Sequence, residues 1–291
     1  MAIRTVVLAG GVVLALALTI ALVLIQPASA PDASEDLAAK SCDLVDDGRL
    51  KPINQVRFTP SHPERQSRMF GVGITDRLSE ACNTLLDAGF TVRDQDNARV
   101  RINDIGETEA VFATYTNVVM LDGSAINPLD GLPSEVAVTL VASSPATYGS
   151  VEYFSVSFTH AEPIPLEQWS AALDDYFGAA TPSEAGYSPY WIVSGNALDD
   201  EASQEECDPR LFNSRARFFD ALPPIDVRAD FEGSIPAHDG QKCTIFVGAE
   251  PVGGDQAGVD RTMIFFADLQ SISANRRAEN AHVRRLLYPV D

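Results

Sequence analysis

The feature that most constrains this chain is a run of twenty uncharged residues near its N-terminus, residues 6–25. Thr19 carries the only polar side chain in the run. As an α-helix rising about 1.5 Å per residue, the run would span about 30 Å, the thickness of a bilayer's hydrocarbon core. Arg4 precedes it, and three carboxylates follow it before the next cation, Lys40. Because positive charge stays on the cytoplasmic side, the rest of the chain is predicted to lie outside the cytoplasm.

Two interpretations of this run remain open: a membrane anchor, or a cleaved secretory signal over residues 1–30. Ala28-Ser29-Ala30 has the small-x-small pattern of a signal cleavage site. The apolar part of a signal is usually about 7–15 residues long, however, and this run is longer. A proline at position 31 also stiffens the bond that would be cut. We therefore favour a retained anchor, and under either interpretation residues 31–291 lie in a periplasm or outside the cell.

All four cysteines lie in this exported part, and an even number in an oxidising compartment favours disulfides. Three pairings are possible, and the spacing favours Cys42 with Cys82 and Cys207 with Cys243. Closing a loop of about 40 residues is worth roughly 4 kcal/mol in the chain-entropy model. Because no C-x-x-C spacing occurs, we predict no zinc site.

The order of the patterned segments predicts an α+β fold with antiparallel sheets and packed helices. Apolar residues at helical spacing predict a helix over 76–88, capped by Thr75, and a second helix over 34–45 would point Cys42 inward. A helix over 166–177 is predicted to turn an apolar face that includes Leu166 and Tyr176 toward the sheet. The predicted strands of this part cover residues 90–93 and 98–103 around a turn at 94–97, then 109–120, 135–142 and 151–159.

A stretch rich in proline and small residues, 179–190, marks a boundary. We therefore expect two lobes, residues 31–178 and a smaller lobe over residues 207–291, joined by an acidic linker over 179–206. In the second lobe the pattern predicts a helix over 208–220, strands over 225–231, 242–247 and 261–267, and a helix over 274–287.

The net charge of −20 is concentrated in one part of the chain. Residues 102–209 contain 18 Asp and Glu and no Lys or Arg. Such a block repels nucleic acid and anionic lipid, so we exclude nucleic acid as a partner. A cationic partner, bound Ca²⁺ or a salty environment would relieve the repulsion, and a solvated acidic surface is the plainer interpretation.

The charge layout also predicts two partner-binding segments. The first is an exposed acidic run with the carboxylates Asp199, Asp200, Glu201, Glu205 and Glu206. The second is the basic C-terminal helix with Arg276, Arg277, Arg284 and Arg285. We expect the acidic block to stay exposed and to face a cationic protein or solution cations.

No motif for catalysis or for a cofactor stands out in the sequence. The four histidines show no i, i+4 spacing, and Ser188 does not lie in a G-x-S-x-G turn. We therefore predict no cofactor and favour a non-catalytic function, as an exported, membrane-anchored accessory or protein-binding subunit of an envelope complex. An exported hydrolase whose site forms only in the tertiary structure remains an alternative, as does a soluble ligand-binding module.

Overall fold

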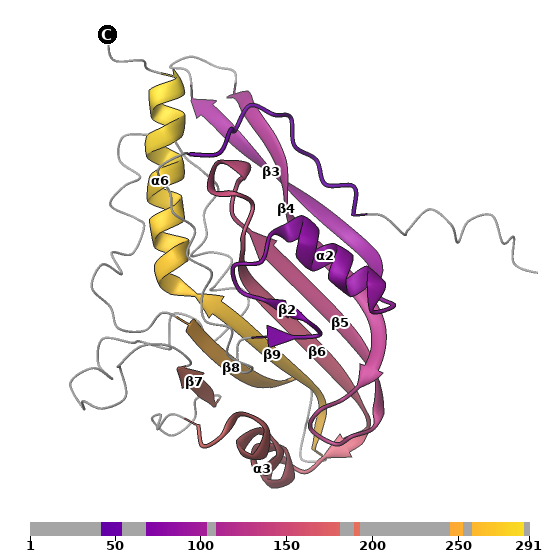
Figure 1. Cartoon of the computed structure of the whole chain (residues 1–291). Coiled ribbons are helices and arrows are strands. Elements are labelled where there is room, and N and C mark those ends of the chain that lie inside the picture. The colour runs from indigo at the N-terminus through magenta and orange to yellow at the C-terminus, as the bar shows by residue number, and fades with distance from the viewer. Residues whose placement is uncertain are drawn as a thin grey trace, which may run out of the picture. The chain divides into compact units, whose positions relative to one another are not determined.

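One antiparallel sheet of seven strands carries the fold, in the order β3-β4-β5-β6-β9-β8-β7 (Figure 1). The computed structural model describes residues 42–53, 68–103, 109–180, 189–192, 245–252 and 258–287. The strands are β3 (Thr91–Asn103), β4 (Glu109–Ile126), β5 (Pro133–Ala142), β6 (Val151–Ile164), β7 (Tyr190–Ile192), β8 (Ile245–Val252) and β9 (Val259–Asp268). Every pair of neighbours is antiparallel. Together with its helices, this sheet confirms the predicted α+β class.

The described strands pair across the boundaries expected between the two lobes. β6, from the expected lobe 31–178, pairs with β9 from the expected lobe 207–291 along a register that includes Phe154↔Phe266. β7 lies in the expected linker 179–206, yet it pairs with β8 at the edge of the same sheet. A two-stranded hairpin such as β8–β9 cannot bury an apolar face alone, and joining the sheet of the first half stabilises it.

The sheet buries one face beneath helices. On β6, Phe154, Val156 and Phe158 share this face because successive side chains of a strand alternate between faces. Their core cluster includes residues of α2 (Leu78–Asp87), of the short strands β1 (Arg68–Met69) and β2 (Val72–Gly73), and of α3 (Leu166–Phe177). Figure 1 shows α2 lying across the middle strands and α3 at the lower end.

α2 lies within the predicted range 76–88 but begins later than expected. The carboxylate of Asp76 accepts a hydrogen bond from the backbone N–H of Gly73 at 2.9 Å and pairs with Arg68 at 2.7 Å. Asp76 therefore belongs to the loop before the helix, and Thr75 is not the N-cap.

α3 has the predicted bounds, but its apolar face is narrower than we expected. Trp169, Leu173 and Phe177 recur every four residues and are buried. Leu166 and Tyr176, which we expected to point inward, are exposed. The helix therefore leaves apolar side chains in contact with solvent.

Cys42 and Cys82 form the predicted disulfide, with their Cα atoms 6.2 Å apart. Cys82 lies on the buried stripe of α2, as predicted. The described end of the predicted helix 34–45 is not helical, since residues 42–45 run in a non-helical conformation. The backbone N–H of Val45 instead donates to Oγ1 of Thr116 on β4 at 2.8 Å, and the carbonyl of Val45 accepts from the N–H of Thr116 at 2.9 Å. Pairing with the sheet thus replaces helical hydrogen bonding here.

Strands are longer in the structure than in the prediction. The predicted turn at 94–97 is part of β3, which pairs with β4 through three register shifts. β-Bulges of this kind let a strand with poor strand-forming residues continue along its partner. β4 also runs on to Ile126, past the predicted end at 120.

The C-terminal helix α6 (Leu269–Leu287) is longer than the predicted 274–287. Its buried residues include Asn275, Glu279, Asn280 and Val283, so most of its inward side is polar. Among the helices that the structure describes, none is both long and apolar enough to cross a membrane, and the run 6–25 lies outside the described residues.

Candidate functional site

A buried histidine lies at the end of the sheet's apolar face. His160 follows Phe158 by two residues on β6 and so points to the same face. Its side chain is 0% exposed. A buried polar group that lacks a hydrogen-bond partner costs about 1–3 kcal/mol, so the partners of this ring decide whether it stabilises the fold.

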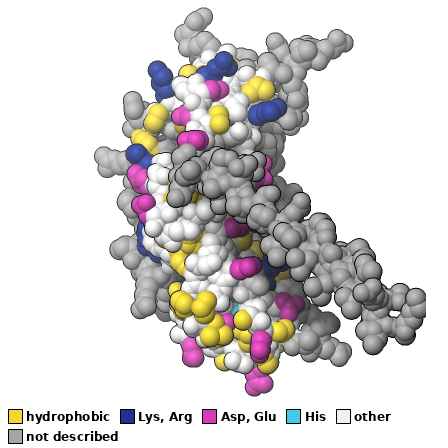
Figure 2. Space-filling model, turned by 90° about the vertical axis from the view of Figure 1, so that its right-hand side faces the viewer, with side chains coloured by type: hydrophobic (Ala, Val, Ile, Leu, Met, Phe, Trp, Pro, Cys, Tyr) yellow, Lys and Arg dark blue, Asp and Glu magenta, His cyan; other side chains and the backbone are white. Residues whose placement is uncertain are grey.

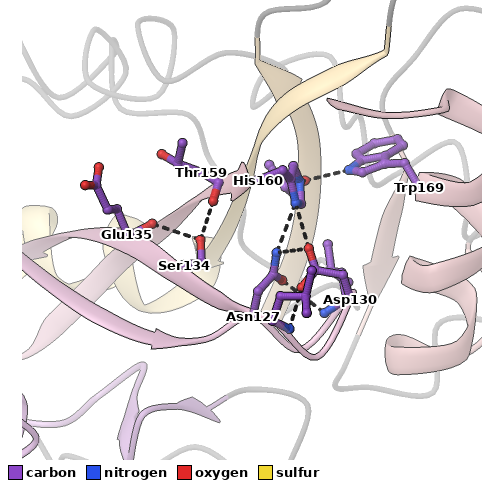
Figure 3. Close-up of polar contacts among 10 residues, drawn as sticks. Asn127, Asp130, Ser134, Glu135, Thr159, His160 and Trp169 are labelled. Carbon is purple, nitrogen blue, oxygen red and sulfur yellow. Dashed lines mark hydrogen bonds and ion pairs between the residues drawn. The ribbon is translucent and has the colours of Figure 1, made fainter. Parts of the chain in front are cut away.

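Both ring nitrogens of His160 have partners, and Figure 3 labels Asn127, Asp130 and Trp169 around the ring. Nδ1 lies 3.0 Å from Nδ2 of Asn127 and 3.2 Å from Oδ2 of Asp130. Nε2 lies 2.7 Å from Oγ1 of Thr262 on β9, and the indole N–H of Trp169 donates to that same oxygen at 2.8 Å. We call these five residues the His160 cluster.

The amide of Asn127 bears on which ring nitrogen of His160 accepts a hydrogen bond. Its Oδ1 accepts from the backbone N–H of Leu129 at 3.0 Å, which orients its Nδ2 toward Asp130 and His160. Nδ2 carries two hydrogens, one for Asp130 Oδ2 at 3.1 Å and one for Nδ1 of the ring. We infer that Nδ1 accepts and that Nε2–H donates to Thr262, which satisfies both ring nitrogens.

Hydroxyl, imidazole and carboxylate occur here in the order of a hydrolase triad, as Thr262, His160 and Asp130. A nucleophile must reach its substrate. The side chain of Thr262 is buried, with 0% of the residue exposed, and its oxygen already contacts His160 and Trp169. The cluster is therefore built as a structural network, which joins the β4–β5 turn and α3 to β6 and β9.

The β4–β5 turn is itself held by two side-chain hydrogen bonds. Asn127 Oδ1 accepts from Leu129, and Asp130 Oδ1 accepts from the N–H of Leu132 at 2.9 Å. Such bonds from Asn and Asp to a backbone N–H two residues later are typical of turns. Next to the turn, Ser134 Oγ donates to the carbonyl of Thr159, which attaches β5 to β6 (Figure 3).

Two buried carboxylates join α6 to the rest of the fold. Glu279 Oε1 accepts from the N–H of Ser144 at 2.7 Å and from Oγ1 of Thr147 at 2.6 Å, in the loop around the short helix η2 (Pro145–Thr147). Asn275 donates to Oε1 of Glu152 at 2.8 Å. Both carboxylates are at most 1% exposed, and these contacts explain the polar inward side of the helix.

Glu250 on β8 has a perturbed ionisation. Burial raises the pKa of Glu250 from 4.5 to about 7. Its Oε1 is buried without a hydrogen-bond partner. Desolvation without a compensating contact favours the protonated form, which accounts for the direction of the shift.

Large apolar side chains are exposed around the His160 cluster. Leu166 is 61% exposed, Ile126 60% and Leu132 51%, and these are the three most exposed large apolar residues in the described part of the chain. Ile126 and Leu132 flank the β4–β5 turn, and Leu166 begins α3. In Figure 2 apolar side chains gather at the lower end among carboxylates, the same end that carries α3 in Figure 1. We call this surface, defined by Ile126, Leu132 and Leu166, the apolar end.

The structure tests only some of the predicted site residues. The carboxylates of the run 199–206, Cys207, Cys243 and Ser188 lie outside the described residues. In α6, Arg285 is exposed and Arg277 and Arg284 are partly buried, while only the backbone of Arg276 is described. These arginines stay predicted partner-binding residues.

The described acids of the block 102–209 are mostly on the surface. The exposed ones are Glu135, Glu162, Glu167, Asp174 and Asp175. Glu152 is the clear exception, since it is buried against α6.

Only weak sequence signals indicate the His160 cluster. Asn127-Pro128 and Asp130-Gly131 are typical of turns, and the alternation of β6 alone places His160 among buried aromatic residues. Linear spacing does not indicate Thr262, which lies 102 residues from His160.

No protein-family model matches the sequence, and neither the curated proteins nor the solved structures include a match. Within the described ranges, no group of three or more His, Cys, Asp or Glu is placed to hold a metal ion.

Proposed function

We propose that this chain is an exported, membrane-anchored accessory subunit that binds another envelope protein through the apolar end. The observation that carries the proposal is that the three most exposed large apolar side chains of the described residues lie in two segments, the β4–β5 turn and the start of α3. Scattered exposed apolar residues are ordinary, but a group of them on one surface is typical of an interaction site.

The His160 cluster supports the same proposal. The cluster joins the β4–β5 turn and α3 to the same pair of strands, β6 and β9. The exposed apolar side chains of the turn and of α3 are therefore held in fixed positions relative to each other. A surface held in place loses less conformational entropy on binding than a mobile one. Covering the exposed part of each Ile or Leu side chain contributes about 1 kcal/mol to binding.

The disulfide is compatible with export. Cys42–Cys82 would form and persist in an oxidising compartment, which agrees with the orientation expected from the N-terminal run. If residues 6–25 are a retained anchor, the full-length protein stays in the membrane fraction through a carbonate wash. A soluble chain that starts at residue 31 would contradict the anchor and leave the binding proposal to be tested by itself.

Site-specific photo-crosslinking in the native cells tests the binding proposal. A benzoylphenylalanine at position 132 or 166 should give one discrete crosslinked protein in near-stoichiometric yield. The matched control carries it at position 111, where Val111 is 42% exposed on β4. Equal products from all three positions, or none from 132 and 166, would reject the apolar end as the binding surface.

The order of Thr262, His160 and Asp130 favours one alternative, an exported hydrolase. In that case Trp169 would have to leave Thr262 before a substrate could reach the hydroxyl. A fluorophosphonate probe tests this alternative directly, because it would label Thr262 in the wild type and not in Thr262→Val. Absence of labelling in a folded, full-length wild type rules out Thr262 as the nucleophile of such a hydrolase.

A further inference from the structure

The segments that build the apolar end carry charge of only one sign. Residues 126–135 and 159–178 contain six carboxylates and no Lys or Arg. They are Asp130, Glu135, Glu162, Glu167, Asp174 and Asp175. All but Asp130 are exposed.

The neighbouring strand does little to balance this charge. Arg261 of β9 is exposed and is the register partner of Thr159, but the exposed Asp260 precedes it. Among the described ion pairs, none joins an Arg or Lys to the six carboxylates. Within the described residues, the negative potential around the apolar end is therefore left for solution cations or for a partner.

We propose that the apolar end binds a cationic amphipathic segment of its partner protein. The apolar side of that segment would cover Ile126, Leu132 and Leu166, and its Lys or Arg side chains would face the surrounding carboxylates. This inference rests on the proposed function and adds the chemistry of the partner. Complementary charge directs encounter and orientation, while the apolar contacts supply most of the affinity.

The same charges disfavour the other occupants of an apolar surface. An anionic membrane is repelled by a rim of carboxylates, and so is a second copy of this end in a symmetric dimer, because like charges would then be juxtaposed. A partner with apolar and basic residues on opposite sides of one segment meets both features of the surface at once.

The test uses the full chain in zwitterionic lipid nanodiscs and a fluorescent 18-residue peptide with Leu on one helical face and Lys on the other. Fluorescence anisotropy measures binding, with empty nanodiscs as the blank. In a second peptide every Lys is replaced by Glu. A third peptide has the same amino-acid composition as the first, but its sequence is scrambled so that Leu and Lys do not separate onto opposite helical faces. We expect the first peptide to bind at least tenfold more tightly than either control peptide.

Matched variants locate the binding on the chain. The triple variant Ile126→Ser, Leu132→Ser and Leu166→Ser should weaken the first peptide at least tenfold. The control is Val45→Ser, Val111→Ser and Leu286→Ser, which removes three other exposed apolar side chains and should leave binding unchanged. Equal losses in both triple variants would overturn the proposal, as would binding that the empty nanodiscs account for.

A charge variant separates the carboxylates from the apolar contacts. Glu162→Gln, Glu167→Gln and Asp175→Asn should weaken binding severalfold at 20 mM salt and little at 300 mM, since screening shortens to roughly 8 Å near physiological ionic strength. We leave Asp174 in place because its carboxylate accepts from the N–H of Ala180 at 3.3 Å.

The matched charge control neutralises three exposed carboxylates elsewhere, Glu80, Asp87 and Asp96, and should not change the salt dependence. If the Glu peptide binds as tightly as the Lys peptide, the cationic partner is rejected. If a protein is crosslinked at position 132 in cells while the Lys peptide does not bind, the proposed function stands and this partner chemistry falls. If the Lys peptide binds but no protein is crosslinked at position 132 in cells, the proposed function is rejected, while the binding chemistry of the apolar end stands.

Discussion

Replacing Thr262 by valine tests the central hydrogen bonds of the His160 cluster. Valine has nearly the same shape as threonine, so the substitution removes the hydroxyl without opening a cavity. The hydroxyl oxygen lies 2.7 Å from Nε2 of His160 and accepts from Trp169 at 2.8 Å, and no part of Thr262 is exposed to water. Thr262→Val therefore leaves an imidazole nitrogen and an indole N–H buried without a partner.

The size of the effect follows from these two groups. A buried polar group that loses its partner costs about 1–3 kcal/mol, so two groups give about 2–6 kcal/mol of lost stability. Thr262→Ser keeps the hydroxyl and loses one methyl group, which costs about 1 kcal/mol in a buried site. The difference between the two variants isolates the hydroxyl from the packing.

A double-mutant cycle identifies the indole as one of the two orphaned groups. Trp169→Phe removes the N–H, so that Thr262→Val can no longer leave it unpaired. The double variant should therefore lose less stability than the sum of the single variants, by about 1 kcal/mol or more.

Urea unfolding of the purified full-length chain in mild detergent, followed by far-UV circular dichroism, measures the stability of the wild type and the four variants. The reasoning is refuted if the free energies of unfolding of Thr262→Val and Thr262→Ser differ by less than about 0.5 kcal/mol. Deviations of that size occur even between sites that do not interact. Strict additivity in the cycle would likewise show that Thr262 and Trp169 do not depend on each other.

Three further predictions concern the rest of the described fold. Replacing Cys42 and Cys82 by serine should cost about 4 kcal/mol, since the disulfide closes a loop with a sequence separation of 40; an unchanged urea midpoint would contradict it. Burial raises the pKa of Glu250 to about 7, so the folded state holds the proton more tightly than the unfolded state; stability should fall as pH rises from about 4.5 to about 7, and Glu250→Gln should flatten that slope. Identical slopes for wild type and variant in urea unfolding would reject the shift. A Cβ at Gly123 would lie 2.6 Å from the ring of Phe90, so Gly123→Ala should cost about 1–3 kcal/mol in the same assay, whereas a neutral result would show that the ring moves freely.

Local patterns predicted the elements of this fold well because each depends on a short stretch of sequence. The bounds of α3 match the prediction, and the buried stripe of α2 contains Cys82 as its spacing indicates. The strands of the β4–β6 region were also predictable, since alternation and turn residues both lie within about ten residues of each other.

Non-local pairing could not be predicted in the same way. The apolar pattern of β9 requires a partner strand but does not indicate which one, so the Phe154↔Phe266 register between distant segments was missed and two lobes were expected. Residues 42–45 fit a helical face equally well, yet they pair with β4. In both cases tertiary contacts outweighed a pattern that was locally consistent.

The composition of the His160 cluster explains why an apolar binding surface can lie next to a buried polar network. α3 packs on the core through Trp169, Leu173 and Phe177, which leaves Leu166 exposed. Ile126 and Leu132 beside the turn are exposed as well, so all three side chains are available to a partner. Hydrogen bonds from Asn127 and Trp169 add a second attachment of both elements to the strands beneath, and such bonds need only a few buried atoms. The arrangement makes binding depend on the cluster even though the cluster touches no partner. Thr262→Val, studied at low urea where it is still folded, should therefore weaken the Lys peptide severalfold, while Gly123→Ala, a comparable destabilisation on β4, should leave its affinity unchanged.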